Sequence, residues 1–296
     1  MSAGSGPTAA GLLQWYAAVQ RDLPWRRTRD PYRILVSEVM LQQTQVARVV
    51  PYYASFLARF PDAATLAVAP VADVLAAWSG LGYNRRALAL MRAARVVVER
   101  GWPTTAAGLR SLPGVGPYTA AAIASAAFGE PVAVVDINVR RVIERLDGHA
   151  RKPAALQARA QQLLELESGA GPGERSATFN QATMELGATV CMARVARCEA
   201  CPLATCRSRG RVRPALRRPT TGDGSRPQRF EDTDRWVRGR IIAGLVSGEG
   251  LPAGVDATRL ERALAGLERD GLVERGPAGS VRLPQARRLG QQGRIR

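Results

Sequence analysis

The stretch LPGVGPYT at residues 112–119 decides the fold, because it predicts a tight hairpin between two helices. Gly114 and Gly116 flank one apolar residue, which allows the backbone amides of the turn to point outward as an anion-binding nest. Pro117 suits the first turn of the following helix, whose positive end then faces the same spot. A plain turn between helices needs no second glycine. The stretch therefore predicts a sequence-independent phosphate clamp, the helix–hairpin–helix device.

Helical periodicity extends on both sides of this hairpin, from residue 12 to about residue 190. Apolar residues at helical spacing between Ile34 and Val50 predict one long helix. Strand-like alternation is nearly absent, and the short run PVAVV at 131–135 predicts a buried extended link. This part of the chain is therefore expected to be all-α. The same spacing predicts further helices over residues 71–78, 87–98, 120–128 and 154–166.

An acidic residue, Asp136, follows the extended link, twenty residues after Gly116. An acid in this position can be merely a helix N-cap. The intervening helix of about 12 residues, or ~18 Å, can also return the chain towards the phosphate clamp. Asp136 is therefore a candidate for a role beside the clamp as well as a helix cap.

Cysteines occur in one place only. Cys191, Cys198, Cys201 and Cys206 fall within sixteen consecutive residues and are the only cysteines of the chain. Disulfides usually close loops between distant segments, so this clustering indicates a shared ligand. Four thiolates suit either a tetrahedral zinc ion or an iron–sulfur cubane. Structural zinc sites usually contain two C-x-x-C pairs and this loop contains one, so the spacing favours a [4Fe–4S] cluster only modestly.

The charge of the chain indicates a polyanionic partner. Lys and Arg total 42 against 25 Asp and Glu, which gives a formal net charge of +17 at pH 7. Such an excess attracts polyanions over long range, and nucleic acid is the commonest of them. A solvated basic surface is the alternative. Lys152 is the only lysine, and this arginine bias can also arise from coding composition.

The remaining composition is that of a globular protein, with 296 residues of which 46% are hydrophobic. No apolar run approaches membrane-spanning length, and the start of the chain lacks the basic and apolar regions of a signal peptide. We therefore expect a cytoplasmic, nucleoid-associated protein of bacterial type with no membrane partner. Thiols stay reduced in that compartment, which supports metal ligation by the cysteines.

The sequence predicts a series of segments with different character. They are a disordered tail at 1–11, a helical domain at 12–206 that includes the cysteine loop at 191–206, a basic linker at 207–229, and a small module at 230–296. The linker is rich in Arg, Pro and Gly. Helices followed by a β-wing predict a winged-helix-like module. Its expected elements are helices at 236–246 and 257–270, and a hairpin of 272–274 with 281–283.

Several motifs together resemble one group of DNA-repair enzymes. The LPGVGPYT hairpin, Asp136 and the four-cysteine loop are similar to the helix–hairpin–helix superfamily of base-excision DNA glycosylases. The segment SEVMLQQTQV at 37–46 is more specific and resembles the MutY type of adenine DNA glycosylase. The resemblance covers about residues 12–206. It extends to DLPWR at 22–26, GLGY at 80–83 and FNQ at 179–181.

This resemblance implies a fold, a cofactor and a partner. The implied fold is all-helical, with two lobes and DNA between them. The implied cofactor is a [4Fe–4S] cluster on the four cysteines, and the implied partner is double-stranded DNA containing A:8-oxoguanine or A:G mispairs. The implied reaction is base flipping followed by hydrolytic removal of adenine, and we expect the enzyme to be a monomer.

Two carboxylates carry the implied chemistry. Cleavage of an N-glycosidic bond passes through an oxocarbenium-like sugar, so the departing base needs a proton and the sugar needs an anion. By resemblance Glu38 protonates adenine N7 and later helps to activate water, while Asp136 stabilises or transiently bonds the sugar carbon. Glu38 lies in an apolar helix, so we expect burial to keep its carboxyl protonated. Tyr118 and Asn138 are expected to assist at the same centre.

Tyr118 also bears on the type of reaction. In bifunctional relatives such as endonuclease III, a lysine occupies this position and forms a Schiff base with the sugar. Tyrosine has no amine and cannot do this. The resemblance therefore implies a monofunctional glycosylase, which leaves an abasic site without cutting the strand.

The target base must leave the duplex before it can be cut. By resemblance Gln43 is the wedge that fills the gap, and Tyr83 presses from the opposite side. Gly114 and Gly116 would hold phosphate. Without the motifs, each remaining position would be assigned to core or surface. The further residues implied to contact adenine or DNA are Arg21, Trp25, Arg26, Leu41, Gln42 and Gln181.

The chain also departs from the family pattern. Four residues rather than five precede the last cysteine, and Asn84 stands where an aromatic residue is common. About 67 residues follow Phe230, too few for the family's Nudix-like domain that reads 8-oxoguanine. The expected winged-helix-like module would instead add phosphate contacts through arginines at 235, 238 and 240, without choosing a base.

Two alternative functions follow from the same residues. One is a mismatch-specific thymine DNA glycosylase, which shares the tyrosine, the aspartate and the cysteine loop; the LQQT and DLPWR segments favour adenine. The other is a non-catalytic iron–sulfur DNA-binding protein. Glu38 and Asp136 argue against it, because a binding protein has no use for two buried carboxylates beside phosphate.

Overall fold

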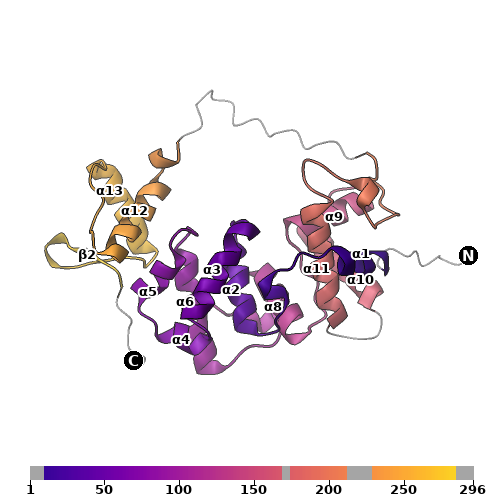
Figure 1. Ribbon diagram of the computed structural model, residues 1–296, viewed down its shortest axis with the longest axis horizontal. Helices are drawn as coiled ribbons and strands as arrows, with labels where there is room; N and C mark the ends of the chain where they lie inside the picture. Colours follow the sequence, from indigo (N-terminus) through magenta and orange to yellow (C-terminus); the bar gives the residue numbers. More distant parts are fainter. Residues whose placement is uncertain (1–9, 169–173, 212–228, 285–296) are drawn as a thin grey trace, which may run out of the picture. The chain divides into compact units, whose positions relative to one another are not determined.

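The computed structural model describes residues 10–168, 174–211 and 229–284. These residues are predominantly helical (Figure 1), which confirms the expected all-α class. The predicted tail at 1–11 and basic linker at 207–229 fall largely on residues that lie outside this part. None of the helices in the described ranges is long and apolar enough to cross a membrane.

The chain folds into two compact units, each built from separate stretches of sequence. We call them the Asp136 unit and the Glu38 unit after one residue in each. The predicted C-terminal module groups with the Glu38 unit. The Asp136 unit comprises residues 1–34, 102–111 and 115–220, and the Glu38 unit comprises residues 35–101, 112–114 and 221–296.

Helices make up almost all regular structure of the Asp136 unit. Two short 3₁₀ turns, η1 (Pro24–Arg26) and η2 (Cys198–Ala200), carry residues expected to be functional. The predicted helices at 120–128 and 154–166 are present with slightly longer bounds. The α-helices are α1 (Ala10–Val19), α7 (Ala106–Leu109), α8 (Pro117–Phe128), α9 (Ile137–Asp147), α10 (Pro153–Ser168) and α11 (Glu174–Thr189).

The Glu38 unit contains the helices predicted at 71–78 and 87–98 and the elements of the C-terminal module. Helix α2 (Pro31–Leu41) begins in the Asp136 unit and ends in this one. The further elements are α3 (Val46–Arg59), α4 (Ala63–Val68), α5 (Val71–Trp78), α6 (Arg85–Arg100), η3 (Phe230–Asp232), α12 (Asp234–Ser247), α13 (Ala257–Arg269), β1 (Glu274–Arg275), η4 (Pro277–Gly279) and β2 (Val281–Arg282).

The single long helix predicted around residues 34–50 is wrong. The structure has two helices here, because α2 ends at Leu41 and α3 begins at Val46. Gln43 in the connecting turn has a left-handed backbone, with φ of 57°. The carbonyls of Val39 and Met40, in the last turn of α2, accept hydrogen bonds from the Arg86 guanidinium at 2.9 and 3.0 Å. Periodicity could not show the break, because a side chain more than forty residues away ends the helix.

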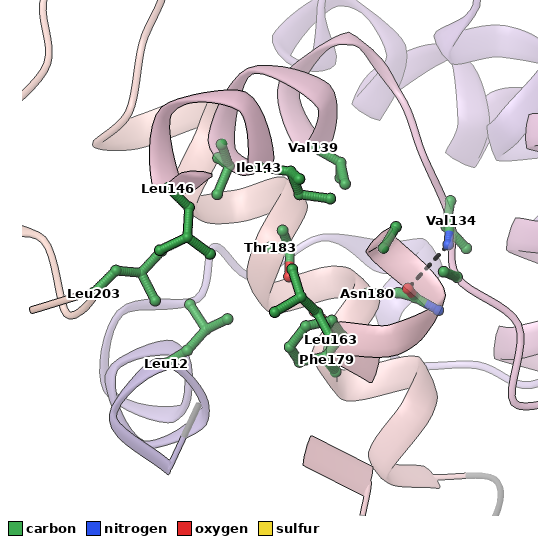
Figure 2. Close-up of a pocket in the computed structure, with 13 residues that line it drawn as sticks. Leu12, Val134, Val139, Ile143, Leu146, Leu163, Phe179, Asn180, Thr183 and Leu203 are labelled. Atoms are coloured by element: carbon green, nitrogen blue, oxygen red, sulfur yellow. Dashed lines mark hydrogen bonds between the residues drawn. The ribbon is translucent and has the colours of Figure 1, made fainter. Parts of the chain in front are cut away.

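The core of the Asp136 unit forms where α1, α9, α10 and α11 pack together. Apolar residues of α9 recur at 139, 142, 143 and 146 and are all buried, which gives this helix one core-facing side. Figure 2 shows Leu12, Ile143, Leu146 and Leu203 pointing into a shared apolar space. Leu203 belongs to the cysteine loop and is 5% exposed. The hydrophobic core therefore holds the cysteine loop against the helix that begins next to Asp136.

The predicted extended link at 131–135 is present. Side-chain amides make the hydrogen bonds to its backbone that a neighbouring strand would make in a sheet. Asn180 accepts from the Val134 amide at 3.0 Å and donates to the Val132 carbonyl at 2.9 Å. Gln157 and Gln161 bind the carbonyl and amide of Ala133, each at 2.9 Å. These bonds satisfy the buried backbone of a segment that lies in neither helix nor sheet. The link is thereby fixed up to the residues that precede Asp136.

The C-terminal module contains the predicted helices and hairpin. Strands β1 and β2 pair antiparallel, with Glu274 opposite Arg282 and Arg275 opposite Val281. Helices α12 and α13 pack together over a small apolar core. Its buried members are Val237, Ile241, Ile242, Ala263, Leu264, Leu267, Leu272 and Val273.

The two glycines of the 112–119 hairpin have different reasons to be glycine. Gly114 has a φ of 78°, and a Cβ there would lie 2.6 Å from the Ala89 Cβ. Gly116 is the N-cap of α8 in an extended conformation open to any residue, and nothing lies within 4 Å of its ideal Cβ position. Folding therefore needs the first glycine, while the second keeps the space before α8 open.

We predict that Gly114→Ala destabilises the protein by about 2–4 kcal/mol, because it combines left-handed strain with overlap against Ala89. Gly116→Ala is the matched control and should change the free energy of unfolding by less than about 1 kcal/mol. Urea unfolding of both variants measures the difference. Equal losses in the two variants would contradict this account of the hairpin.

Candidate active site

Asp136 begins α9 as its N-cap, so that reading of the sequence is confirmed. One carboxylate oxygen accepts from the Val139 amide at 2.6 Å, and the other accepts from the Asn138 side-chain amide at 2.8 Å. Two donors therefore fix the orientation of the carboxylate, while the residue stays partly exposed. The structure thus brings Asp136 and Asn138 together as an oriented anion.

Arg141 connects this anion to the cysteine loop, a link that sequence reasoning missed. Its guanidinium donates to the Asn138 side-chain oxygen at 2.7 Å, to the Gly187 carbonyl at 2.6 Å and to the Cys191 carbonyl at 2.7 Å. Burial lowers the pKa of Arg141. A Cβ on Gly187 would lie 2.7 Å from the Asn138 Cβ, so α11 can approach α9 this closely only at a glycine.

Tyr118 lies in the first turn of α8, partly buried beside the extended link. Its ring packs with Ala121, Val134 and Met184, and its hydroxyl lies 3.5 Å from the Met184 sulfur. Val134 is two residues before Asp136, so the tyrosine packs on the segment that leads to the aspartate. The residue at this position is therefore a tyrosine and not a lysine.

Three of the four expected pocket residues in this unit line one groove. Trp25, Arg26 and Gln181 border a space of about 800 Å³ together with residues of α1 and the end of α8. The Arg26 Nε donates to the Gln181 side-chain oxygen at 3.2 Å. Trp25 is 8% exposed in the η1 turn. The groove is lined by aromatic and polar side chains alike, and its volume is that of a small-ligand site.

Glu185 binds Arg26 of this groove and also Arg21, which does not line the groove, and sequence reasoning missed it. It is 1% exposed and accepts from Arg21 at 2.6 and 2.8 Å and from Arg26 at 2.7 Å. Burial alone would raise the pKa of Glu185, but the hydrogen bonds and charges of the two arginines outweigh it and lower the pKa. The available signal was one acid in α11, four residues after Gln181 and so on the same helix face.

In the Glu38 unit, Glu38 lies on α2 and is 8% exposed. Its neighbours Val36, Ser37 and Met40 are completely buried. The expected burial of this carboxyl is therefore present. Leu41 is the last residue of α2 and is partly exposed, as is Gln42 in the turn that follows.

Gln43 and Tyr83, the two residues expected to probe the duplex, both have a left-handed backbone conformation. Among the described residues, Gln43 and Tyr83 are the non-glycine residues with positive φ, at 57° and 51°. Gln43 is exposed, and Tyr83 is 40% exposed. Such conformations cost about 1–3 kcal/mol and persist only where surrounding contacts impose them, most often at functional sites.

Arg86 imposes much of this conformation, and no sequence motif pointed to it. Its guanidinium donates to acceptors from the turn after α2 and from the loop before α6. It also lies 5.4 Å from the Tyr83 ring centroid and 5.5 Å from that of Trp78. Burial lowers the pKa of Arg86 to about 10, so it remains charged at neutral pH. The acceptors are the carbonyls of Val39, Met40, Gln42, Leu81 and Gly82 and the hydroxyl of Thr44.

The four cysteines are free thiols that border one shared cavity, together with Arg145, Arg197 and Arg209. Arg145 lies 3.3 Å from the Cys191 sulfur through Nη1, and its carbonyl accepts from the Cys206 thiol at 3.3 Å. Burial raises the pKa of Cys201 and Cys206. No group of three or more His, Cys, Asp or Glu side chains in the described ranges is arranged to hold a metal ion. The four thiols border a cavity that is also lined by the positively charged side chains of Arg145, Arg197 and Arg209.

We predict that Glu185→Ala destabilises the protein by about 3 kcal/mol at pH 7, because it leaves two arginines without their shared carboxylate. A carboxyl with a lowered folded pKa contributes its full stability above its unfolded pKa, about 4.3, and loses it as the pH falls through the folded value. The difference from wild type should therefore shrink in acid. Urea midpoints measured at several pH values test this.

Asp22→Ala is the matched control, because it removes the Asp22–Arg27 ion pair, whose side chains are 68% and 69% exposed. Exposed pairs contribute little to stability. We expect its urea midpoint to match wild type. A Glu185→Ala midpoint equal to that of Asp22→Ala would show that the buried network is not stabilising.

Comparison with known proteins defines the class first. Residues 36–166 match the HhH-GPD superfamily base excision DNA repair protein family. A thermostable thymine-DNA glycosylase has the same fold, with a TM-score of 0.62 and 31% identity over 69% of this chain and 95% of that one. An endonuclease III from a trapped DNA covalent intermediate aligns with a TM-score of 0.57 at 22% identity, over 67% and 92% of the two chains. The chain is a helix–hairpin–helix base-excision glycosylase.

The sequence relatives then define the family. The adenine DNA glycosylase of Mycolicibacterium smegmatis is 41% identical over 286 residues, which is 92% of this chain and 94% of the relative. The human adenine DNA glycosylase is 46% identical over 214 residues, 68% of this chain and 39% of the human protein. The chain belongs to the adenine DNA glycosylase family. An alignment over 92% of the chain also reaches into residues 230–296, so the bacterial relative has a counterpart of part of the C-terminal module.

Proposed function

We propose that the protein hydrolyses adenine from A:8-oxoguanine and A:G mispairs in double-stranded DNA and leaves the abasic strand uncut. The observation that carries the proposal is the contrast between two carboxylates. Glu38 is buried in an apolar stretch of α2, whereas Asp136 is partly exposed and held by two donors. Such a pair supplies one acid and one anion. We further propose a monomer that works in the bacterial cytoplasm, at the nucleoid.

Each carboxylate has a defined task in this proposal. Glu38 keeps its proton in the buried site and delivers it to adenine N7 as the glycosidic bond breaks. Asp136 stays ionised and stabilises the positive charge that develops on the sugar. Asn138 holds the Asp136 carboxylate at 2.8 Å. Tyr118 lines the same centre and, lacking an amine, forms no Schiff base, so no strand cleavage follows.

The remaining residues bind and open the duplex. Gly116 leaves the start of α8 open for a phosphate, since no atom lies within 4 Å of its ideal Cβ position. Gln43 fills the space left by the flipped adenine, and Tyr83 contacts the opposite side. Trp25, Arg26 and Gln181 receive the base in their groove. Leu41 and Gln42 lie at the end of the Glu38 helix and border the same substrate.

The four thiols of Cys191, Cys198, Cys201 and Cys206 are the donor set that a [4Fe–4S] cluster uses, and they would hold it. All four thiols are free, they border one cavity, and Arg145 and Arg209 provide positive charge beside a group that is anionic with four thiolates. When bound, the cluster supplies a structural cross-link of the loop. Arg194 and Arg197 are exposed on this loop and are available for DNA phosphates. Through Arg141, the loop also supports Asn138 and thereby Asp136.

Glu38→Gln tests the assignment of the acid. The amide is isosteric but carries no proton to donate, so we expect the variant to fold, bind duplex and release adenine at least 100-fold more slowly. Single-turnover release from A:8-oxoguanine and A:G duplexes measures this. Near-normal release by Glu38→Gln would refute the role of Glu38. The same assay with Thr44→Ser, a conservative change in the adjoining turn, controls for local disturbance.

A thymine-specific reaction is the second candidate, favoured by the similarity to the thermostable thymine-DNA glycosylase. The two functions separate in one experiment. Incubation with T:G, A:G and A:8-oxoguanine duplexes should release adenine and leave thymine in place. Release of thymine from T:G without adenine from the other duplexes would replace the proposed function by this alternative.

We predict that the purified protein is brown, with broad absorption near about 400 nm and about four irons per chain. Cys198→Ser should lower the iron content and the yield of DNA-binding protein, because one corner of the cluster loses its thiolate. Glu199→Gln changes the adjacent exposed residue and should keep wild-type iron. Colourless protein with one zinc per chain would contradict the proposed cofactor.

A further inference from the structure

The C-terminal module contacts the loop that carries Tyr83, within the Glu38 unit. The Arg235 guanidinium of α12 lies 4.0 Å from the Tyr83 ring centroid, and its Nη1 donates to the Tyr83 hydroxyl at 2.9 Å. Gly82 permits this approach, since a Cβ there would lie 3.3 Å from the same guanidinium. A second contact joins Arg85 of α6 to Asp270 at 3.4 Å. Helix α12 also packs against α5.

Tyr83 is therefore held by two guanidinium groups. Arg86 lies 5.4 Å from its ring centroid and Arg235 lies 4.0 Å from it. The backbone φ of 51° is one that a tyrosine rarely adopts by itself. Yet the side chain remains 40% exposed. Its surroundings thus fix the ring while leaving part of its surface accessible to a ligand.

Arg235 is itself fixed by the folding of the module. Thr233 caps α12, and its side chain accepts from the Trp236 amide at 3.3 Å. Arg238, one turn further along α12, pairs with Asp270, which also contacts Arg85. Helix α12 is thus connected through Asp270 to Arg85 at the start of α6.

These contacts give residues 235–240 a use in addition to the expected phosphate contacts. Arg235 donates a hydrogen bond to the Tyr83 hydroxyl, and Arg238 forms an ion pair with Asp270. Arg240 lies 5.8 Å from the Trp236 ring and makes no such contact with the Tyr83 loop. The arginines of one helix therefore have different tasks.

We propose that Arg235 is a positioning residue through which the C-terminal module orients Tyr83, and that this contact increases the preference for 8-oxoguanine over guanine opposite adenine. The proposal rests on the proposed function and takes Tyr83, on the side opposite Gln43, to contact the base that stands opposite adenine. A ring that is already oriented gives up less conformational freedom when it stacks on a base. 8-Oxoguanine differs from guanine by an oxygen at C8 and a hydrogen on N7, and a contact surface held in one orientation can respond to that difference.

The planar shape of arginine makes the proposal testable. Arg235→Lys keeps the positive charge that a phosphate contact needs but loses the flat, delocalised group that stacks on a ring. A phosphate role predicts that Arg235→Lys behaves as wild type. A positioning role predicts that Arg235→Lys loses discrimination almost as fully as Arg235→Ala.

The experiment uses the full-length protein with its native iron content. Single-turnover adenine release is measured on A:8-oxoguanine and A:G duplexes, and the ratio of the two rates is compared. We expect the ratio to fall about 5- to 20-fold in Arg235→Ala, the size of one cation–π contact and one hydrogen bond. Arg240→Ala is the matched control on the same helix and should keep the wild-type ratio even if binding to both duplexes weakens.

A double-mutant cycle with Tyr83→Ala shows whether Arg235 acts through the tyrosine. In the Tyr83→Ala background, removal of Arg235 should have no further effect on the ratio. A wild-type rate ratio in Arg235→Ala or in Arg235→Lys would overturn the proposal. So would an Arg235→Ala effect on the ratio that is equally large in the Tyr83→Ala background.

Failure of the proposed function gives a different result. A wild-type enzyme that releases no adenine would refute that function. Arg235 can still be tested by binding. The affinities for duplexes that carry 8-oxoguanine or guanine opposite a non-hydrolysable adenine analogue are measured, and their ratio is compared between wild type and the same variants. Wild-type binding without preference between these duplexes would overturn the proposal for Arg235 as well.

Discussion

The Arg86 guanidinium is the constraint on which the local architecture around Glu38 and Tyr83 depends. It donates to the end of α2 and to the loop before α6. By donating to the carbonyls of Val39 and Met40, it satisfies the last turn of the helix that carries Glu38, next to the turn in which Gln43 has a left-handed backbone. One partly buried cation therefore contacts both the end of the helix that carries Glu38 and the turns that contain the two probing residues. A lysine could not replace it, because only guanidinium has donors in a planar fork.

Arg141 has the corresponding role in the Asp136 unit. It joins the Asn138 side chain to the Gly187 and Cys191 carbonyls, so the start of α9, the end of α11 and the cysteine loop share one donor. A loop that is remote in sequence from the aspartate is thus connected to it by three hydrogen bonds, through Arg141 and Asn138. Loss of order in the cysteine loop would therefore reach the Asp136 carboxylate as well as the exposed arginines of the loop.

Local patterns were enough to predict the helices at 71–78, 87–98, 120–128 and 154–166, the buried Glu38, the Asp136 cap and the extended link. Each depends on residues close in sequence: apolar spacing, an acid before a helix, a short β-branched run. The break at residues 42–45 and the roles of Arg86, Arg141 and Glu185 depend on partners far away in the chain. An arginine that binds distant carbonyls has the same sequence signature as one in solvent. These residues were therefore invisible until the fold placed their acceptors.

The net charge of +17 was first attributed either to phosphate contacts or to a solvated surface. The structure adds a third use, because Arg86, Arg141 and Arg145 bind backbone carbonyls at the ends of helices and loops. A carbonyl is a dipole, so it satisfies the guanidinium without cancelling its charge. The same arginines that end helices and support the two carboxylates therefore also contribute to the positive field that attracts DNA. Stability and DNA attraction do not compete for these residues, which gives a physical reason for arginine in a chain with a single lysine.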